Sequence, residues 1–139
     1  MAKKIVAGNW KMNLDSKGAS DLLMELNDQL SASEVRVIIF PPSLYAARLA
    51  ELRGALLEVG VQNFHYEQEG AFTGEISIDQ VKSAGCNIGL IGHSERREYF
   101  NEDHALLKRK VDAALKNDFE FIFCCGEPLN MRESGREFE

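Results

Sequence analysis

Five short apolar segments recur along the chain, at residues 4–9, 35–40, 57–62, 87–92 and 119–125. Each has the length and the content of β-branched or aromatic residues that is typical of a buried strand. The second segment, VRVIIF, carries the strongest signal. The pattern therefore predicts five strands.

The intervals between these segments carry helical spacing. In the first interval five apolar residues fall on one face of a helix: Ala19, Leu22, Leu23, Leu26 and Leu30. Asp15 or Ser16 would cap this helix, because a side-chain oxygen there accepts a free N–H of the first turn.

Three more helices are predicted. One follows Pro42, and another lies in SIDQVKSAG, where Ser77 and Gln80 have the spacing of a capping box and Gly85 suits the left-handed position after the last turn. The fourth runs from about residue 103 to 116 and is marked by Leu107, Val111, Ala114 and Leu115.

Alternating strands and helices imply right-handed crossovers and a parallel sheet in an α/β protein. Both an open doubly wound sheet and a (β/α) barrel fit this order, and in both of them ligands gather at the carboxyl ends of the strands. The 139 residues are enough for one domain with its own core, so we expect residues 1–139 to form a single domain.

Composition narrows the possible partners and the location. The net charge of −6 argues against a nucleic-acid partner, which would require a basic surface. No apolar run is long enough for a membrane span or a signal peptide. Three cysteines, Cys86, Cys124 and Cys125, have no metal-type spacing and do not form an even disulfide set, so reduced thiols in the cytoplasm are expected.

Polar side chains converge at the predicted carboxyl ends of the strands. Asn9 and Lys11 follow the first strand, and His93, Ser94 and Glu95 follow the fourth. An amide, an ammonium and an imidazole at one rim are the polar groups of a small-molecule site. Taken singly, Lys11 also fits a solvated charge and His93 a structural histidine. The SERR segment also fits a polar turn that opens a helix.

Four motifs stand in a specific order: AGNWKMN, GAFTGEIS after QN, GHSERR, and CCGEPL with RESG. Together they resemble the triosephosphate isomerase family along essentially the whole chain. The resemblance implies a (β/α)₈ barrel that interconverts dihydroxyacetone phosphate and glyceraldehyde 3-phosphate through an enediolate, without a cofactor or a metal.

The resemblance also implies roles for individual residues. Asn9 and Lys11 would bind the substrate, and the Lys11 ammonium would offset the phosphate and the developing oxyanion. His93 would be the electrophile, acting as a neutral imidazole. Glu95 would pair with Lys11 and hold it in place, and Ser94 would be a supporting hydrogen-bond partner.

A complete barrel of this type has about 250 residues, so we expect this chain to be an incomplete barrel of five parallel strands and four helices. The family's catalytic glutamate, its lid and its phosphate-binding loop would lie in an absent C-terminal part. Glu127 matches a structural residue and does not replace the base. We therefore expect the chain to be inactive without a complementing C-terminal segment. The alternative is a non-catalytic truncated fragment, or a self-associating assembly or binding module.

The loop from Gln62 to Ser77 suggests a partner subunit. In the family this loop reaches into a second subunit, so the resemblance implies a homodimer with Thr73 near the other active site and Glu75 paired with Arg96 across the interface. Its local interpretation is only a long loop with glycine turns, although loops of this length are uncommon unless they are functional.

Overall fold

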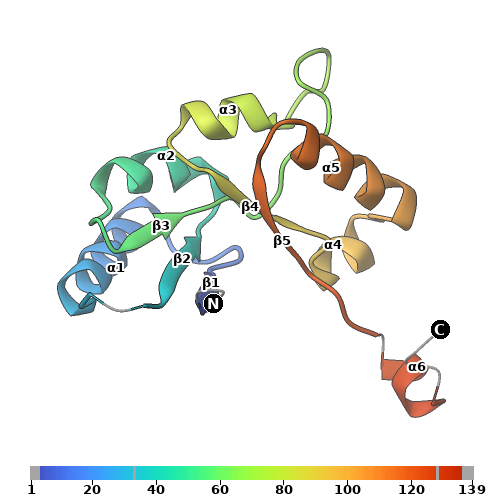
Figure 1. Ribbon diagram of the computed structural model, residues 1–139, viewed down its shortest axis with the longest axis horizontal. Helices are drawn as coiled ribbons and strands as arrows, with labels where there is room; N and C mark the ends of the chain where they lie inside the picture. The colour runs from blue at the N-terminus through green and yellow to red at the C-terminus, as the bar shows by residue number, and fades with distance from the viewer. Residues whose placement is uncertain (1–3, 33, 128, 136–139) are drawn as a thin grey trace.

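The five predicted strands are present in the computed structural model, which describes residues 4–32, 34–127 and 129–135 (Figure 1). β1 (Ile5–Asn9), β2 (Arg36–Phe40) and β3 (Leu57–Val59) form one parallel sheet in that order. β4 (Ile88–Ile91) and β5 (Glu120–Phe123) form a second parallel pair. A bridge between Val61 and Gly89 joins the two sheets. The parallel α/β architecture and its five strands are therefore confirmed, as part of a barrel wall.

The four predicted helices are also present: α1 (Ser16–Gln29), α2 (Ser43–Leu52), α3 (Ile78–Ser83) and α5 (His104–Lys116). The expectation of four helices in all was wrong, since the described residues contain two more. α4 (Ser94–Tyr99) follows β4 directly, and α6 (Leu129–Glu133) follows β5 after an extended stretch. Both are one to two turns long and leave little apolar periodicity to detect. α3 is as short as α4 but was marked by its capping box, whereas the N-cap of α4 is His93, which is not a usual capping residue.

Side-chain hydrogen bonds cap the starts of α1 and α3 as expected, and a left-handed glycine follows the end of α3. Asp15 caps α1, with its Oδ1 accepting from the Gly18 N–H at 2.8 Å. At α3 the capping box of Ser77 and Gln80 is complete. Gly85, after α3, has φ of +79°, a conformation that residues with a Cβ rarely adopt.

Alternate residues of a strand point in opposite directions, and β2, β3 and β4 bury most of their side chains on both faces. The expectation of buried strands was wrong for β1 and β5, which lie at the edges of their sheets: Ile5 is 45%, Val6 58% and Phe123 44% exposed. On one face Ile38 and Phe40 pack with Ile88 and Leu90, and Ile122 lies against them. The other face packs against the helices, through residues that include Ala19, Leu23, Ala46, Leu49, Leu107 and Ala114. The predicted inner faces of α1 and α5 are confirmed at these positions, with one error: Leu115 is 68% exposed.

The seam between the two sheets depends on glycine. A Cβ on Gly60 would lie 2.5 Å from Cε1 of Phe40 and 2.7 Å from the carbonyl oxygen of Ile88. A Cβ on Gly89 would lie 2.9 Å from Cδ1 of Phe64. Real Cβ atoms do not approach other atoms so closely, so the strands meet here only because both positions lack a side chain.

Arg36, the first residue of β2, joins the two sheets near the start of β5. Its guanidinium donates to both carboxylate oxygens of Glu58, at 2.8 and 2.7 Å, and to both of Glu120, at 2.6 and 2.9 Å. These bonds, first those to Glu58 and then those to Glu120, raise the pKa of the Arg36 guanidinium. Because Glu58 is on β3 and Glu120 is on β5, one side chain ties both sheets together.

Candidate active site

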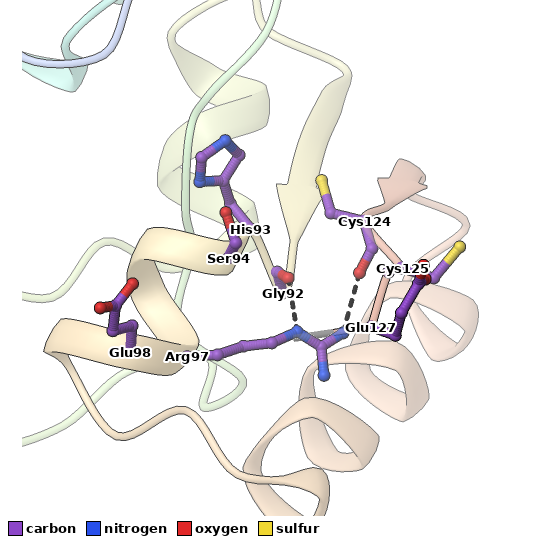
Figure 2. Close-up of a pocket in the computed structure, with 9 residues that line it drawn as sticks. Gly92, His93, Ser94, Arg97, Glu98, Cys124, Cys125 and Glu127 are labelled. Atoms are coloured by element: carbon purple, nitrogen blue, oxygen red, sulfur yellow. Dashed lines mark hydrogen bonds between the residues drawn. The ribbon is translucent and has the colours of Figure 1, made fainter. Parts of the chain in front are cut away.

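An open hollow of about 800 Å³ lies at the carboxyl ends of β4 and β5. Figure 2 shows its lining, which comes from the turn after β4, from α4 and from the stretch after β5. Nine residues line it: Gly92, His93, Ser94, Arg97, Glu98, Cys124, Cys125, Gly126 and Glu127. The hollow therefore forms at the end of the sheet where the sequence predicts a site, and it includes His93 and Ser94.

Lys11 occupies a strained turn directly after β1. Its φ is +53°, which costs free energy for a residue with a Cβ. Two polar side chains hold the turn. The Lys11 N–H donates to Oδ1 of Asn9 at 2.9 Å, and the Gln62 amide donates to the Lys11 carbonyl at 2.9 Å and to the Phe40 carbonyl at 2.8 Å. The backbone at Lys11 is therefore positioned from β1, from β2 and from the chain after β3.

The ammonium of Lys11 reaches across to α4. Its Nζ lies 2.7 Å from Oε1 of Glu95, although 84 residues separate the two in sequence. The hydrogen bond from Lys11 lowers the pKa of the Glu95 carboxyl against the opposing effect of burial, and the positive charge of Lys11 acts in the same direction as the hydrogen bond. Both side chains remain about half exposed, so the ammonium can also bind an anion that enters from solvent. The predicted pairing of Lys11 with Glu95 is thus present.

His93 is the N-cap of α4, and its Nδ1 accepts the Glu95 backbone N–H at 3.3 Å. An Nδ1 that accepts carries no proton, so the proton of a neutral ring lies on Nε2, which is then a hydrogen-bond donor. The orientation of the ring is thus coupled to the first turn of α4. The four predicted catalytic residues form one connected set, from Asn9 through Lys11 and Glu95 to His93.

Ser94 lies beside this set but does not join it. It is exposed at the start of α4, and within the part of the chain that the structure describes its side chain makes no hydrogen bond. Its supporting role stays a prediction.

Of the three predicted interface residues, Thr73, Glu75 and Arg96, the last two are bonded to other residues of this chain. Thr73 is exposed in the loop between β3 and α3, which projects from the body in Figure 1. Glu75 Oε2 lies 3.4 Å from Nδ1 of His65, and Arg96 donates to Glu102 at 2.7 Å. Glu75 and Arg96 line one hollow. Their pairing across an interface stays a prediction.

Glu102 lies under Arg96 as a buried charge. It is 4% exposed and accepts hydrogen bonds from Arg96 and from Lys110, which is 3% exposed. Burial raises the pKa of Glu102, but the hydrogen bonds and charges of Lys110 and Arg96 outweigh it, so the pKa lies below its usual value. Lys110 also bonds Asn63 at 2.5 Å, so this cluster links α5, the end of α4 and the loop after β3.

Sequence reasoning missed two residues of the site. Gln62 holds the turn at Lys11, and Arg97 binds the carbonyls of Gly92 and Cys124 at 2.7 and 2.8 Å. A polar residue directly after an apolar strand was the available signal for Gln62. For Arg97 the sequence offered only a charge in a polar turn, since both of its acceptors are backbone atoms.

Within the described residues, no three histidine, cysteine or acidic side chains converge in a way that could hold a metal ion. Cys86, Cys124 and Cys125 are free thiols.

In the part of the chain that the structure describes, no helix is both long and apolar enough to cross a membrane.

Parallel strands with intervening helices, and polar groups at the carboxyl ends of the strands, are features that (β/α) barrels share with other α/β proteins. The family model for triosephosphate isomerase matches residues 4–139. The chain therefore belongs to the triosephosphate isomerase family.

Curated relatives agree with this assignment. The chain is 42% identical to the triosephosphate isomerase of Alkaliphilus oremlandii over 140 residues, which cover 100% of this chain and 56% of that protein. It is 45% identical to the triosephosphate isomerase of Flavobacterium johnsoniae over 140 residues, covering 99% of this chain and 56% of that protein. For Leptospira borgpetersenii the identity is 43% over 142 residues, with 100% and 57% covered. The chain thus spans about half the length of these relatives.

Proposed function

We propose that this chain supplies the electrophilic half of a triosephosphate isomerase site. In the reaction, a base moves a proton between two carbons of a triose phosphate while hydrogen-bond donors stabilise the enediolate. The observation that carries the proposal is the Nδ1 of His93 accepting the N–H of Glu95, because it leaves Nε2–H as the donor toward substrate. The family is itself the standard example of a neutral histidine electrophile at a helix N-terminus.

Lys11 would bind the anionic substrate. Its ammonium is held by Glu95 at 2.7 Å and is about half exposed, so a triose phosphate can approach it. Preorganised donors such as these lower the barrier most when they face charge that develops during the reaction. Asn9 would add an amide, although its Oδ1 already accepts the Lys11 N–H. Ser94, beside His93 in the hollow, would position the substrate.

The general base is not supplied by these residues. Glu95 pairs with Lys11, and Glu127 lies 3.7 Å from Arg132, a cation that stabilises its charge. We therefore propose that the base and the phosphate-binding backbone come from a complementing C-terminal segment, which completes the barrel. The enzyme named by the relatives is favoured over a non-catalytic module, since each relative compared is an isomerase.

We extend the proposal to a homodimer in the cytoplasm. Apolar side chains near the rim support it, with Met12 96% and Phe100 62% exposed. Exposed apolar groups of this size are typical of interfaces when they cluster. Thr73 would then enter the partner's site, and Glu75 would meet Arg96 of the second copy. Free thiols fit a reducing compartment.

The test joins this chain to the C-terminal segment of the Flavobacterium johnsoniae relative and measures kcat and KM. His93→Gln is expected to lower kcat at least about 10²-fold, as removal of an acid–base group does, with little change in KM. His104→Gln is the matched control, because His104 is exposed at the start of α5. The 139-residue chain alone is expected to show no turnover. Enzyme-like turnover by the chain alone, or an unchanged kcat in His93→Gln, would refute the proposal.

A further inference from the structure

We propose that Arg97 is a positioning residue for His93, which it acts on through the turn at Gly92. Among the described residues, the hydrogen bonds of the Arg97 guanidinium go to backbone carbonyls and not to a side chain of the proposed reaction. The guanidinium thereby joins the end of β4, from which the chain continues to His93, to the chain just beyond the end of β5 (Figure 2). The proposal rests on the electrophile role proposed above for His93, although its test does not require turnover.

The turn at Gly92 sets the direction in which His93 leaves the sheet. β4 ends at Ile91, Gly92 follows with φ of +73°, and His93 caps α4. A left-handed residue between a strand and a helix reverses the chain sharply, so a small rotation at Gly92 moves the imidazole. The Gly92 carbonyl accepts from Nε of Arg97 at 2.7 Å, which fixes the orientation of this peptide group.

The same guanidinium also donates a hydrogen bond to the chain at the end of β5. Its Nη2 donates to the Cys124 carbonyl at 2.8 Å, directly beyond the end of β5. The last backbone bond of this ladder runs from the Cys124 N–H to the Ile91 carbonyl at 2.8 Å. Arg97 therefore connects the two strands by side-chain hydrogen bonds just beyond the last backbone hydrogen bond between them. The planar guanidinium presents several N–H donors in a fixed arrangement and can bind both carbonyls at once. A lysine ammonium has no such fixed arrangement of donors.

The Arg97 guanidinium packs against the Gly92 turn and against an aromatic ring. A Cβ added to Gly92 would lie 2.8 Å from Nη2 of Arg97 and 3.2 Å from Cδ2 of Leu107. The Arg97 guanidinium also lies over the Phe123 ring, 5.6 Å from its centroid. Gly92 is thus matched to Arg97: the absence of its side chain provides both the turn and the space for the guanidinium.

The backbone of α4 completes the connection to His93. The His93 carbonyl accepts from the Arg97 N–H at 3.2 Å, and Nδ1 of His93 accepts from the Glu95 N–H. Loss of the Arg97 side chain would release the Gly92 peptide group, and the first turn of α4 could rotate relative to β4. The bond at Nδ1 is 3.3 Å long, so a small rotation is enough to break it.

The test is a long-range ¹H–¹⁵N correlation spectrum of the 139-residue chain, which contains only three histidines. Spectra are recorded above neutral pH, where an ordinary imidazole is uncharged. The wild-type His93 is expected to show two well-separated nitrogen shifts, as for a ring with its proton fixed on Nε2. In Arg97→Met the two shifts should move toward each other, because the tautomers mix once the bond at Nδ1 is lost.

Arg48→Met is the matched control, since Arg48 is exposed on α2, and it should leave the His93 signals unchanged. Arg97→Lys should give an intermediate separation. Unchanged His93 shifts in folded Arg97→Met would overturn the proposal. If Arg97→Met does not fold, Arg97→Lys provides the test. A difference between the two His93 nitrogen shifts equal to that of the wild type would overturn the proposal that the guanidinium is required. A smaller difference would support it.

A kinetic readout separates this inference from the proposed function. In the fused protein described above, Arg97→Met should lower kcat about 10²-fold, as misplacement of a reacting group by about 1 Å does, while KM changes little. If His93→Gln retains full kcat but Arg97→Met still changes the His93 shifts, the electrophile role fails and the positioning contact stands.

Discussion

Gly60→Ala tests the seam between the two sheets. The added Cβ would lie 2.5 Å from Cε1 of Phe40 and 2.7 Å from the backbone oxygen of Ile88. Phe40 is 0% and Ile88 is 2% exposed, so neither can move into solvent without disturbing the core. Overpacking of this kind costs about 1–3 kcal/mol. Lower entropy of the unfolded chain returns about 0.4–1 kcal/mol.

The clash outweighs the entropy gain, so Gly60→Ala should reduce the free energy of unfolding by about 1–2 kcal/mol. With a urea m-value of about 1–3 kcal/mol/M, the midpoint of urea unfolding, measured by far-UV circular dichroism, should fall by about 0.3–2 M. Gly8→Ala is the control, because a Cβ on Gly8 would meet its nearest atoms at 4.0 Å, an ordinary contact.

A double-mutant cycle identifies the cause. Phe40→Leu removes the ring atom nearest to the new Cβ, so adding Gly60→Ala to it should cost roughly 1 kcal/mol less than adding it to the wild type. The contact with the Ile88 oxygen remains, and the rescue is therefore partial. A Gly60→Ala midpoint equal to that of Gly8→Ala, or strictly additive costs with Phe40→Leu, would refute the reasoning.

Three further predictions concern charged groups. Glu102 has a lowered pKa in the folded state, so its contribution to stability is full above its usual pKa and is lost as pH falls through the folded value. Glu102→Gln should lower the free energy of unfolding by about 3 kcal/mol at neutral pH. Below about pH 4.5 the free energy of unfolding, measured with urea, should fall less steeply with pH in Glu102→Gln than in the wild type. The same pH dependence in both proteins would contradict this prediction. Arg36→Met should cost about 1–2 kcal/mol in urea unfolding, because Glu58 and Glu120 are half exposed and screened; a cost that does not shrink in high salt would argue against ion pairing. Asp15→Ala should cost about 1 kcal/mol through loss of the α1 cap, whereas Asp15→Ser should retain most of the stability.

Much of the fold followed from local rules. Apolar runs marked all five strands, because a strand packed on both faces is built from apolar residues. The runs did not distinguish the buried strands from β1 and β5, whose residues are exposed or half-buried. Asp15 and the capping box at Ser77 were predicted from spacing, since a cap bonds an N–H only two or three residues away. The rim positions of Asn9, Lys11 and His93 followed from where the apolar runs stop.

Contacts between distant residues were harder to predict. As a charged residue, Lys110 would be expected on the exposed face of α5. It is buried instead, and its ammonium is paired with the buried carboxylate of Glu102. Arg36 has the charge of a surface residue, but it links β3 to β5 across the sheets. A hydrogen-bond partner 84 residues away leaves no periodic signal in the sequence.

The sequence by itself determined the order of the elements, their caps, and the chemistry available at the rim. Only the tertiary structure decided how these groups are held: Gln62 supports the strained turn at Lys11, and Arg97 joins the ends of β4 and β5 behind His93. The physical reason is that both side chains bind backbone carbonyls. Every residue has such a carbonyl, so only the folded arrangement of the strands selects which ones these side chains meet.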